Sequence, residues 1–96
     1  MTHPSATATV QIDEPHVRVT EWRFPPGTAT GFHRHAHDYV VVPIVPGTLT
    51  MVDGEGKATE AELVFGHSYA RPAGVEHDVV NASAAEVAFV EIELKR

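Results

Sequence analysis

Hydrophobic and β-branched residues occur along this chain in short runs, each ended by glycine, proline or a polar turn. No run keeps the 3.6-residue period of an amphipathic helix over a useful length. Closely spaced short runs with turn residues between them are typical of an all-β sandwich or barrel. We therefore predict an all-β domain of about eight strands, with runs at residues 17–22, 32–45, 48–52, 60–65, 68–71, 77–81 and 87–94.

Three stretches add detail to this pattern. Residues 1–8 are small, polar and interrupted by proline, which predicts a flexible N-terminal arm before a single domain over residues 9–96. Pro43 cannot donate to a strand ladder, so we expect a kink or bulge there, or an edge strand. Residues 87–90 and parts of 17–24 are apolar on both faces. We expect a second copy of the chain to cover one of these faces, giving a homodimer.

Length and charge limit the possible functions. Ninety-six residues allow one domain with a modest core. Seven basic residues against 13 acidic ones give a net charge of −6, and the basic residues are scattered, which argues against nucleic-acid binding. The chain has no cysteine, which excludes disulfides and thiolate metal sites and fits a reducing compartment. With neither a leader-like start nor an apolar stretch of bilayer length, we expect a cytoplasmic protein that binds no membrane.

Three of the seven histidines lie at alternate positions, His33, His35 and His37, just before an apolar stretch. In a continuous strand they would share one face with Tyr39. If that face pointed outward, the arginine and aspartate that alternate with them would be buried, which is costly unless the two pair. If it points inward, the imidazoles need partners, and one metal ion can satisfy several. This stretch alone leaves both interpretations open.

A second stretch carries glycine, proline, histidine and asparagine at fixed spacing: Gly66, Pro72, Gly74, His77 and Asn81. These residues fill every fixed position of the second cupin motif, and the chain resembles the cupin superfamily. The first cupin motif is matched by Gly27, His33, His35 and Gly47, but Tyr39 and Val40 stand where its glutamate is expected. The resemblance implies a small double-stranded β-helix, or jelly-roll, barrel with the motif histidines pointing into its mouth. Residues 19–49 also resemble the small bacterial cupins named for β-alanine degradation.

The cupin resemblance implies a divalent metal held by His33, His35 and His77. Three roles stay open for His37: a fourth ligand, a replacement for His33 if the frame slips by two, or a hydrogen-bond donor to a ligand. Asp38 is the nearest carboxylate, but its parity points it away unless a bulge turns it inward. A set of neutral nitrogens suits iron, zinc, nickel, copper or manganese better than magnesium or calcium.

Several other side chains are expected near such a site. Tyr39, Tyr69, Arg71 and Asn81 are candidates to line the pocket, as is Glu91 by parity, although Tyr69, Arg71 and Glu91 have surface placements as equal alternatives. Asn81 is expected to act mainly as a structural hydrogen-bonder, and His67 to lie at the surface.

Two functions from different classes follow. The first is a metal-dependent enzyme, dioxygenase-like or an isomerase, acting on a small organic acid or carbonyl compound. The second is a non-catalytic cupin that binds or senses a small molecule and holds a structural metal. The second stays open because no acid–base pair is evident beside the histidines.

Overall fold

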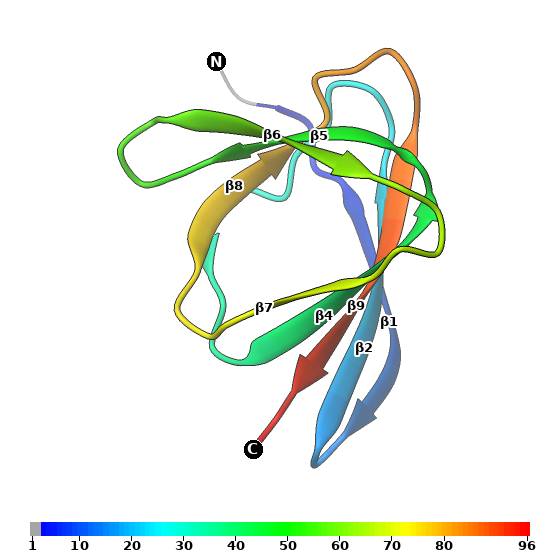
Figure 1. The fold of residues 1–96 in the computed structure, drawn as a ribbon, viewed down its shortest axis with the longest axis vertical. Coiled ribbons are helices and arrows are strands. Elements are labelled where there is room, and N and C mark those ends of the chain that lie inside the picture. Colours follow the sequence, from blue (N-terminus) through cyan, green and yellow to red (C-terminus); the bar gives the residue numbers. More distant parts are fainter. Residues whose placement is uncertain (1–2) are drawn as a thin grey trace.

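The structure of residues 3–96 is a computed structural model, and it shows nine strands and no helix in that range (Figure 1). The all-β prediction is confirmed. The strands are β1 (Thr7–Glu14), β2 (Val17–Phe24), β3 (His33–Arg34), β4 (Asp38–Val45), β5 (Gly47–Val52), β6 (Ala58–Leu63), β7 (Tyr69–Arg71), β8 (Glu76–Val80) and β9 (Val87–Leu94). None of the described residues belongs to a helix that could span a membrane.

Two antiparallel sheets form the barrel. One has the order β1-β2-β9-β4-β7 and the other the order β3-β8-β5-β6. The strands of the smaller sheet lie across from β4, β7 and β9 in Figure 1. Buried side chains from both sheets form one core, in which the rings of Phe24 and Phe89 stack with their centroids 5.6 Å apart. The core fills one end of the barrel, and the histidines lie toward the other.

Side chains alternate along β9, and Glu91, a pocket candidate by its parity, faces the interior. Val87 and Phe89 point into the core, and Glu91 follows them on the same face, only 7% exposed. Val90 and Ile92, on the opposite face, are half-buried. The sequence predicts alternation here, but the glutamates, not the aliphatic residues, face the interior near the end of the strand. This strand therefore brings acidic groups inside the barrel.

The N-terminal segment differs from the expected arm. The N–H of Ala6 donates to the carbonyl of Ala29 at 2.9 Å, and β1 begins at Thr7 and pairs with β2 along its length. Residues 4–8 are therefore held by backbone hydrogen bonds, whereas residues 1–2 of the predicted arm lie outside the described residues. The hydrophobic signal for β1 is weak, because Val10 and Ile12 are its only large apolar residues, and all eight of its residues are exposed.

The long run predicted at residues 32–45 is two strands. The chain leaves strand geometry at residues 35–37, between β3 and β4, and each strand joins a different sheet. A strict alternation of side chains therefore does not extend through all three histidines. The bulge expected at Pro43 is present, because the β4–β9 register shifts between Pro43 and Val45. β4 lies between β7 and β9, so it is not an edge strand.

Candidate metal centre

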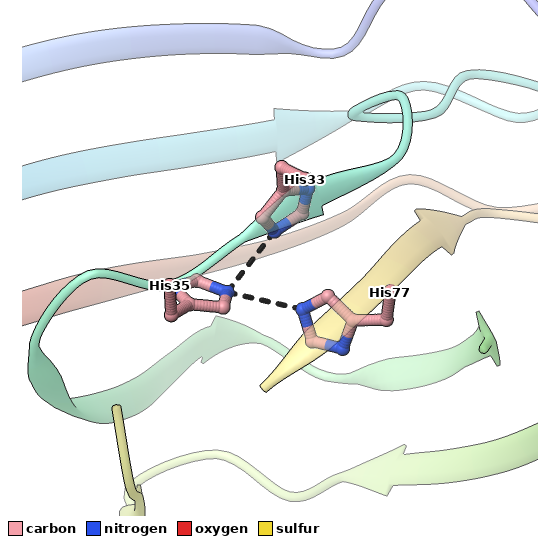
Figure 2. Close-up of side chains that lie close together, drawn as sticks. All are labelled: His33, His35 and His77. Atoms are coloured by element: carbon pink, nitrogen blue, oxygen red, sulfur yellow. Dashed lines mark hydrogen bonds between the residues drawn. The ribbon is translucent and has the colours of Figure 1, made fainter. Parts of the chain in front are cut away.

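Three histidines from two chain segments converge in space (Figure 2). His33 and His77 are a cross-strand pair of β3 and β8, and His35 lies just beyond the end of β3. The Nε2 atom of His35 is 3.0 Å from that of His33 and 3.1 Å from that of His77. The structure therefore brings together the three residues that the motifs single out, over a separation of 42 residues along the chain.

His35 is fixed by the turn between β7 and β8. Its N–H donates to the carbonyl of Val75 at 2.9 Å, and its own carbonyl accepts the N–H of Gly74 at 2.8 Å. Gly74 has φ +97°, a conformation that residues with a Cβ rarely adopt. The ring of His35 stacks on that of Tyr39, with centroids 3.9 Å apart. Gly74 of the second motif thus helps to fix the position of His35 of the first motif.

The ring of His33 is held by its other nitrogen. Its Nδ1 lies 2.9 Å from the carbonyl oxygen of Gly31, an oxygen that can only accept, so Nδ1 carries the proton and donates. The Oγ1 of Thr30 lies 3.3 Å from the same nitrogen. The Nε2 of His33 is therefore left with its lone pair directed at the other two rings. Metal-binding histidines are commonly oriented by such a hydrogen bond.

The protonation states suit a metal ion. Burial, followed by the charges of His33 and His77, lowers the pKa of His35 to about 4. Burial, His33 and Arg71 lower the pKa of His77 to about 4 as well, against an opposing effect of Asp78. Both imidazoles are thus neutral near pH 7, as metal ligation requires.

The spacing of the nitrogens also fits. Two nitrogens at about 2.1 Å from an ion lie about 3.0 Å apart when the angle between the bonds is about 90°, and about 3.4 Å apart at the tetrahedral angle. The observed separations of 3.0 and 3.1 Å are close to the first value. A single cation can accept lone pairs from all three rings, whereas one proton on Nε2 of His35 can serve only one of its two neighbours. His33, His35 and His77 therefore fit a divalent transition metal.

The histidines open into a cavity of about 360 Å³. Its opposite wall is the inner face of β2, β4 and β9, which contributes aromatic rings and two carboxyl groups: Trp22, Tyr39, Phe89, Glu91 and Glu93. Burial, reinforced by the charge of Glu93 and a hydrogen bond with it, raises the pKa of Glu91 to about 7. Burial, followed by the charge of Glu91, raises the pKa of Tyr39 to about 12. The cavity is thus lined by histidine nitrogens from the smaller sheet and its adjoining loop, and by the carboxyl groups of Glu91 and Glu93 from the larger sheet.

His37 is half-buried and lines this cavity, but it lies outside the three-histidine cluster. The expectation that it shares the ligand face assumes a continuous strand, and the chain leaves that geometry between β3 and β4. Asp38 is also outside the cluster. Its Oδ1 accepts the N–H of Ala73 at 2.8 Å, so it holds the turn that supports His35.

The remaining predicted pocket residues divide into two groups. Tyr39, only 3% exposed, belongs to the core and lines the cavity, and Tyr69 lines it too. Arg71 lines an adjoining cavity of about 630 Å³ that shares Tyr69 and His77, and its guanidinium lies over the Tyr69 ring at 5.7 Å. His67 is exposed, as expected.

Asn81 lies outside both cavities, contrary to its place among the predicted pocket residues. β8 ends at Val80, so the alternation that starts at His77 does not extend to it. It is fully buried, and its Nδ2 donates to the carbonyls of Phe24 and Ala85, each at 2.8 Å. Its Oδ1 accepts the N–H of Ser83 at 3.0 Å. This asparagine ties two loops together, which agrees with the structural role expected of it.

Sequence reasoning does not single out three other residues of the cavity wall: Arg18, Trp22 and Glu93. A signal for Glu93 exists, since it lies two residues from Glu91 and therefore on the same strand face. Arg18 pairs directly with Glu93 in the β2–β9 register. Finding that pair requires the order of the strands, which the sequence does not provide.

Comparison with known proteins identifies the family. A family model described as the cupin domain matches residues 20–93. The chain is 60% identical over 92 residues to "Beta-alanine degradation protein BauB" of Pseudomonas aeruginosa, with 96% of each chain covered.

Solved structures of similar proteins have the same fold. A cupin domain from Bordetella pertussis Tohama I is 55% identical with a TM-score of 0.94, over 100% of this chain and 99% of that one. A Klebsiella pneumoniae protein with a double-stranded β-helix domain is 21% identical and shares the fold, with a TM-score of 0.78 over 95% of this chain and 77% of that one. The family match and these relatives, together with the paired motifs and the barrel, show that the chain belongs to the cupin family.

Proposed function

We propose that this cupin binds one divalent transition metal through His33, His35 and His77 and is a metal-dependent, dioxygenase-like enzyme acting on a small organic acid or carbonyl compound. The observation that carries the proposal is the convergence of three oriented Nε2 atoms at the wall of a cavity. Three protein ligands leave coordination positions free for a substrate. When bound, the metal supplies Lewis acidity toward a carbonyl or carboxylate oxygen and a site for dioxygen.

The chain's own groups would bind and orient the substrate. Tyr39, Trp22 and Phe89 give the cavity aromatic walls that limit access of water. The carbonyl of Gly31 accepts a hydrogen bond from the imidazole of His33, and the N–H of Gly74 holds the backbone of His35. A cavity of about 360 Å³ lies at the lower end of the range for small-molecule pockets and has room for a small organic acid.

The name of one similar protein supports a narrower class of substrate. The P. aeruginosa relative carries the name β-alanine degradation protein. At 60% identity along almost the whole of both chains, we extend that role to this protein and propose β-alanine, or a small acid formed from it, as its substrate. Iron, zinc, nickel, copper and manganese are all compatible with the nitrogen ligands.

Metal analysis tests the proposal first. Purified protein, stripped with a chelator and reloaded separately with Fe²⁺ and Zn²⁺, is expected to hold one ion per chain. His77→Ala should abolish loading, while His67→Ala, at an exposed position, serves as the matched control. His37→Ala is expected to keep the ion, because His37 lies outside the cluster. Equal loading of His77→Ala and wild type would contradict the site.

Catalysis is tested with the loaded protein. Ferrous protein is incubated with β-alanine and a panel of three- and four-carbon acids and ketones, and oxygen uptake and products are followed. Turnover that is lost in His77→Ala supports the enzyme. Binding of a panel member without any turnover would instead favour the binding or sensing function.

We also propose that the protein is a homodimer formed through the outer face of the larger sheet. A row of apolar side chains crosses this face in register, joining Ile12, Val19, Ile92, Val40 and Ala70. Ile12 is 46% exposed. Apolar rows of this extent are commonly covered by another subunit. Sedimentation should give a dimer that Ile92→Lys converts to monomer, and a monomeric wild type would overturn this proposal.

A further inference from the structure

Glu91 is a buried carboxyl group that faces the cavity without a cationic partner. It is 7% exposed and lines the same cavity as the histidines, from β9 of the larger sheet. Among the ion pairs of residues 3–96, none involves Glu91, and Arg18 pairs with its neighbour Glu93 at 3.4 Å. A carboxylate is rarely buried without a positive charge or a proton to stabilise it. Once ionised, the Glu91 carboxylate has no cationic side chain paired with it in residues 3–96, and a bound cation would fill that place.

The residues around Glu91 show why no cationic side chain pairs with it. Thr20 of β2 and Val41 of β4 are its direct neighbours in register, and neither carries a charge. The other charged and titratable groups that line the same cavity are Arg18, Arg34, Tyr39, Tyr69 and Glu93, together with His33, His35, His37 and His77. Burial and Glu93 together raise the pKa of Glu91, and no cation offsets them.

The surroundings of Glu91 suit an ammonium group. Phe89 precedes it by two residues on the same strand face, and Trp22 is the cross-strand partner of Phe89. Both rings line the cavity. A carboxylate beside aromatic faces is a favourable environment for an alkylammonium ion, which gains a charge-assisted hydrogen bond and cation–π contact.

The opposite side of the cavity has the opposite polarity. The charge of Arg71 reaches His77, where it helps to lower the pKa of the imidazole. Three histidine nitrogens face the same space and offer no negative charge. One end of the cavity thus favours anions or ligating oxygen atoms, and the other favours cations.

We propose that Glu91, with Glu93 and Trp22, forms a second subsite that binds the ammonium group of a short amino acid whose carboxylate points toward the three histidines. The ligand class is a zwitterion of a few carbons, such as an ω-amino acid. The carboxylate half of this proposal rests on the proposed metal function. The ammonium half rests only on residues of β2 and β9.

Binding of such a cation is coupled to proton release. Below about pH 7, Glu91 holds a proton in the free protein. An ammonium group stabilises the carboxylate, so the proton leaves as the ligand enters. Affinity for the cation should therefore fall about tenfold per pH unit below pH 7, while affinity for an uncharged or anionic analogue should not.

Calorimetric titration with three probes tests the subsite: β-alanine, propionate, which lacks the amine, and propylamine, which lacks the carboxylate. Zinc-loaded wild type at pH 7.5 is expected to bind β-alanine at least about tenfold more tightly than propionate. Glu91→Gln should remove that preference and weaken propylamine by a similar factor, with propionate changed less than about twofold. Glu60→Gln, an exposed glutamate of β6, should match wild type.

Carboxylate binding at the metal and ammonium binding at Glu91 can be tested independently of each other. In metal-free protein, or in His77→Ala, propionate binding should be lost while propylamine binding persists, because the ammonium subsite does not need the metal. Failure of the metal proposal therefore leaves the propylamine result intact. Retention of the β-alanine preference in Glu91→Gln would overturn the subsite, as would wild-type protein that binds neither amine.

A measurement on the wild type guards against misfolding of the variant. Titrations of propylamine at pH 6 in two buffers of different ionisation enthalpy report the number of protons exchanged. Release of close to one proton per amine bound at pH 6, falling toward zero at pH 8.5, supports the role of Glu91. Binding without proton release at pH 6 would contradict it.

Discussion

Replacing Glu91 by glutamine should remove a pH-dependent cost of folding. Glutamine has nearly the same shape as protonated glutamate but never becomes a carboxylate. In the folded protein the pKa of Glu91 is raised from 4.5 to about 7 by burial and by Glu93. The unfolded chain therefore loses this proton near pH 4.5, and the folded protein only near pH 7. The stability of wild type should fall across that window and stay level above it.

The magnitude follows from the size of the shift. Each pH unit corresponds to about 1.4 kcal/mol, so the interval from 4.5 to about 7 gives at most about 3 kcal/mol. The Glu91→Gln variant does not lose this free energy of unfolding, because glutamine does not ionise. Relative to wild type, the variant should thus gain about 2 to 3 kcal/mol in free energy of unfolding between pH 4.5 and pH 8.

Urea unfolding of metal-free protein at half-unit pH steps measures the effect. A chelator keeps the histidine site empty of metal, and a fixed protein concentration removes any contribution from association. The informative quantity is the variant-minus-wild-type difference, because the titration of groups that do not interact with Glu91 cancels in it. Glu60→Gln, on the exposed side of β6, should give a flat difference. A flat difference for Glu91→Gln as well would refute the argument that Glu91 is buried without a cation.

Three further predictions concern other parts of the site. Asn81→Ala should lower the free energy of unfolding in urea by about 3 kcal/mol, because it leaves the carbonyls of Phe24 and Ala85 without the amide donor; stability like that of wild type would contradict its structural role. Gly74→Ala should weaken zinc affinity and lower the melting temperature, since φ is +97° there, whereas Gly54→Ala, which meets only an ordinary contact, should change neither. Bound zinc should survive dialysis to about pH 5, because the pKa values of His35 and His77 are about 4, and half-release near pH 6.5 would contradict this.

Local chemistry made much of this protein predictable. Short β-branched runs and turn residues indicate an all-β chain, and they do so without knowledge of strand order. The motif histidines were predictable because the chain resembles both cupin motifs, whereas the spacing of His33, His35 and His37 alone left a solvated and a ligating interpretation open. Gly74 belongs to the second motif: its positive φ is a property of one residue, yet it sets the position of His35.

Long-range packing decided the rest. Whether β3 and β4 form one strand depends on which sheet each joins, and their separation removes His37 from the ligand cluster. β1 was not evident because only Val10 and Ile12 mark it as a strand, and pairing with β2 is what orders it.

The sequence by itself determined the all-β class and most of the turns, since these depend on neighbouring residues, and its two cupin motifs singled out His33, His35 and His77. Only the tertiary structure decided which face of β9 is inside. An alternating strand has two faces, and alternation cannot say which of them the second sheet covers. Closure of the barrel placed Glu91 and Glu93 inward, opposite the histidines. The charge of the cavity is therefore a property of the assembled sheets.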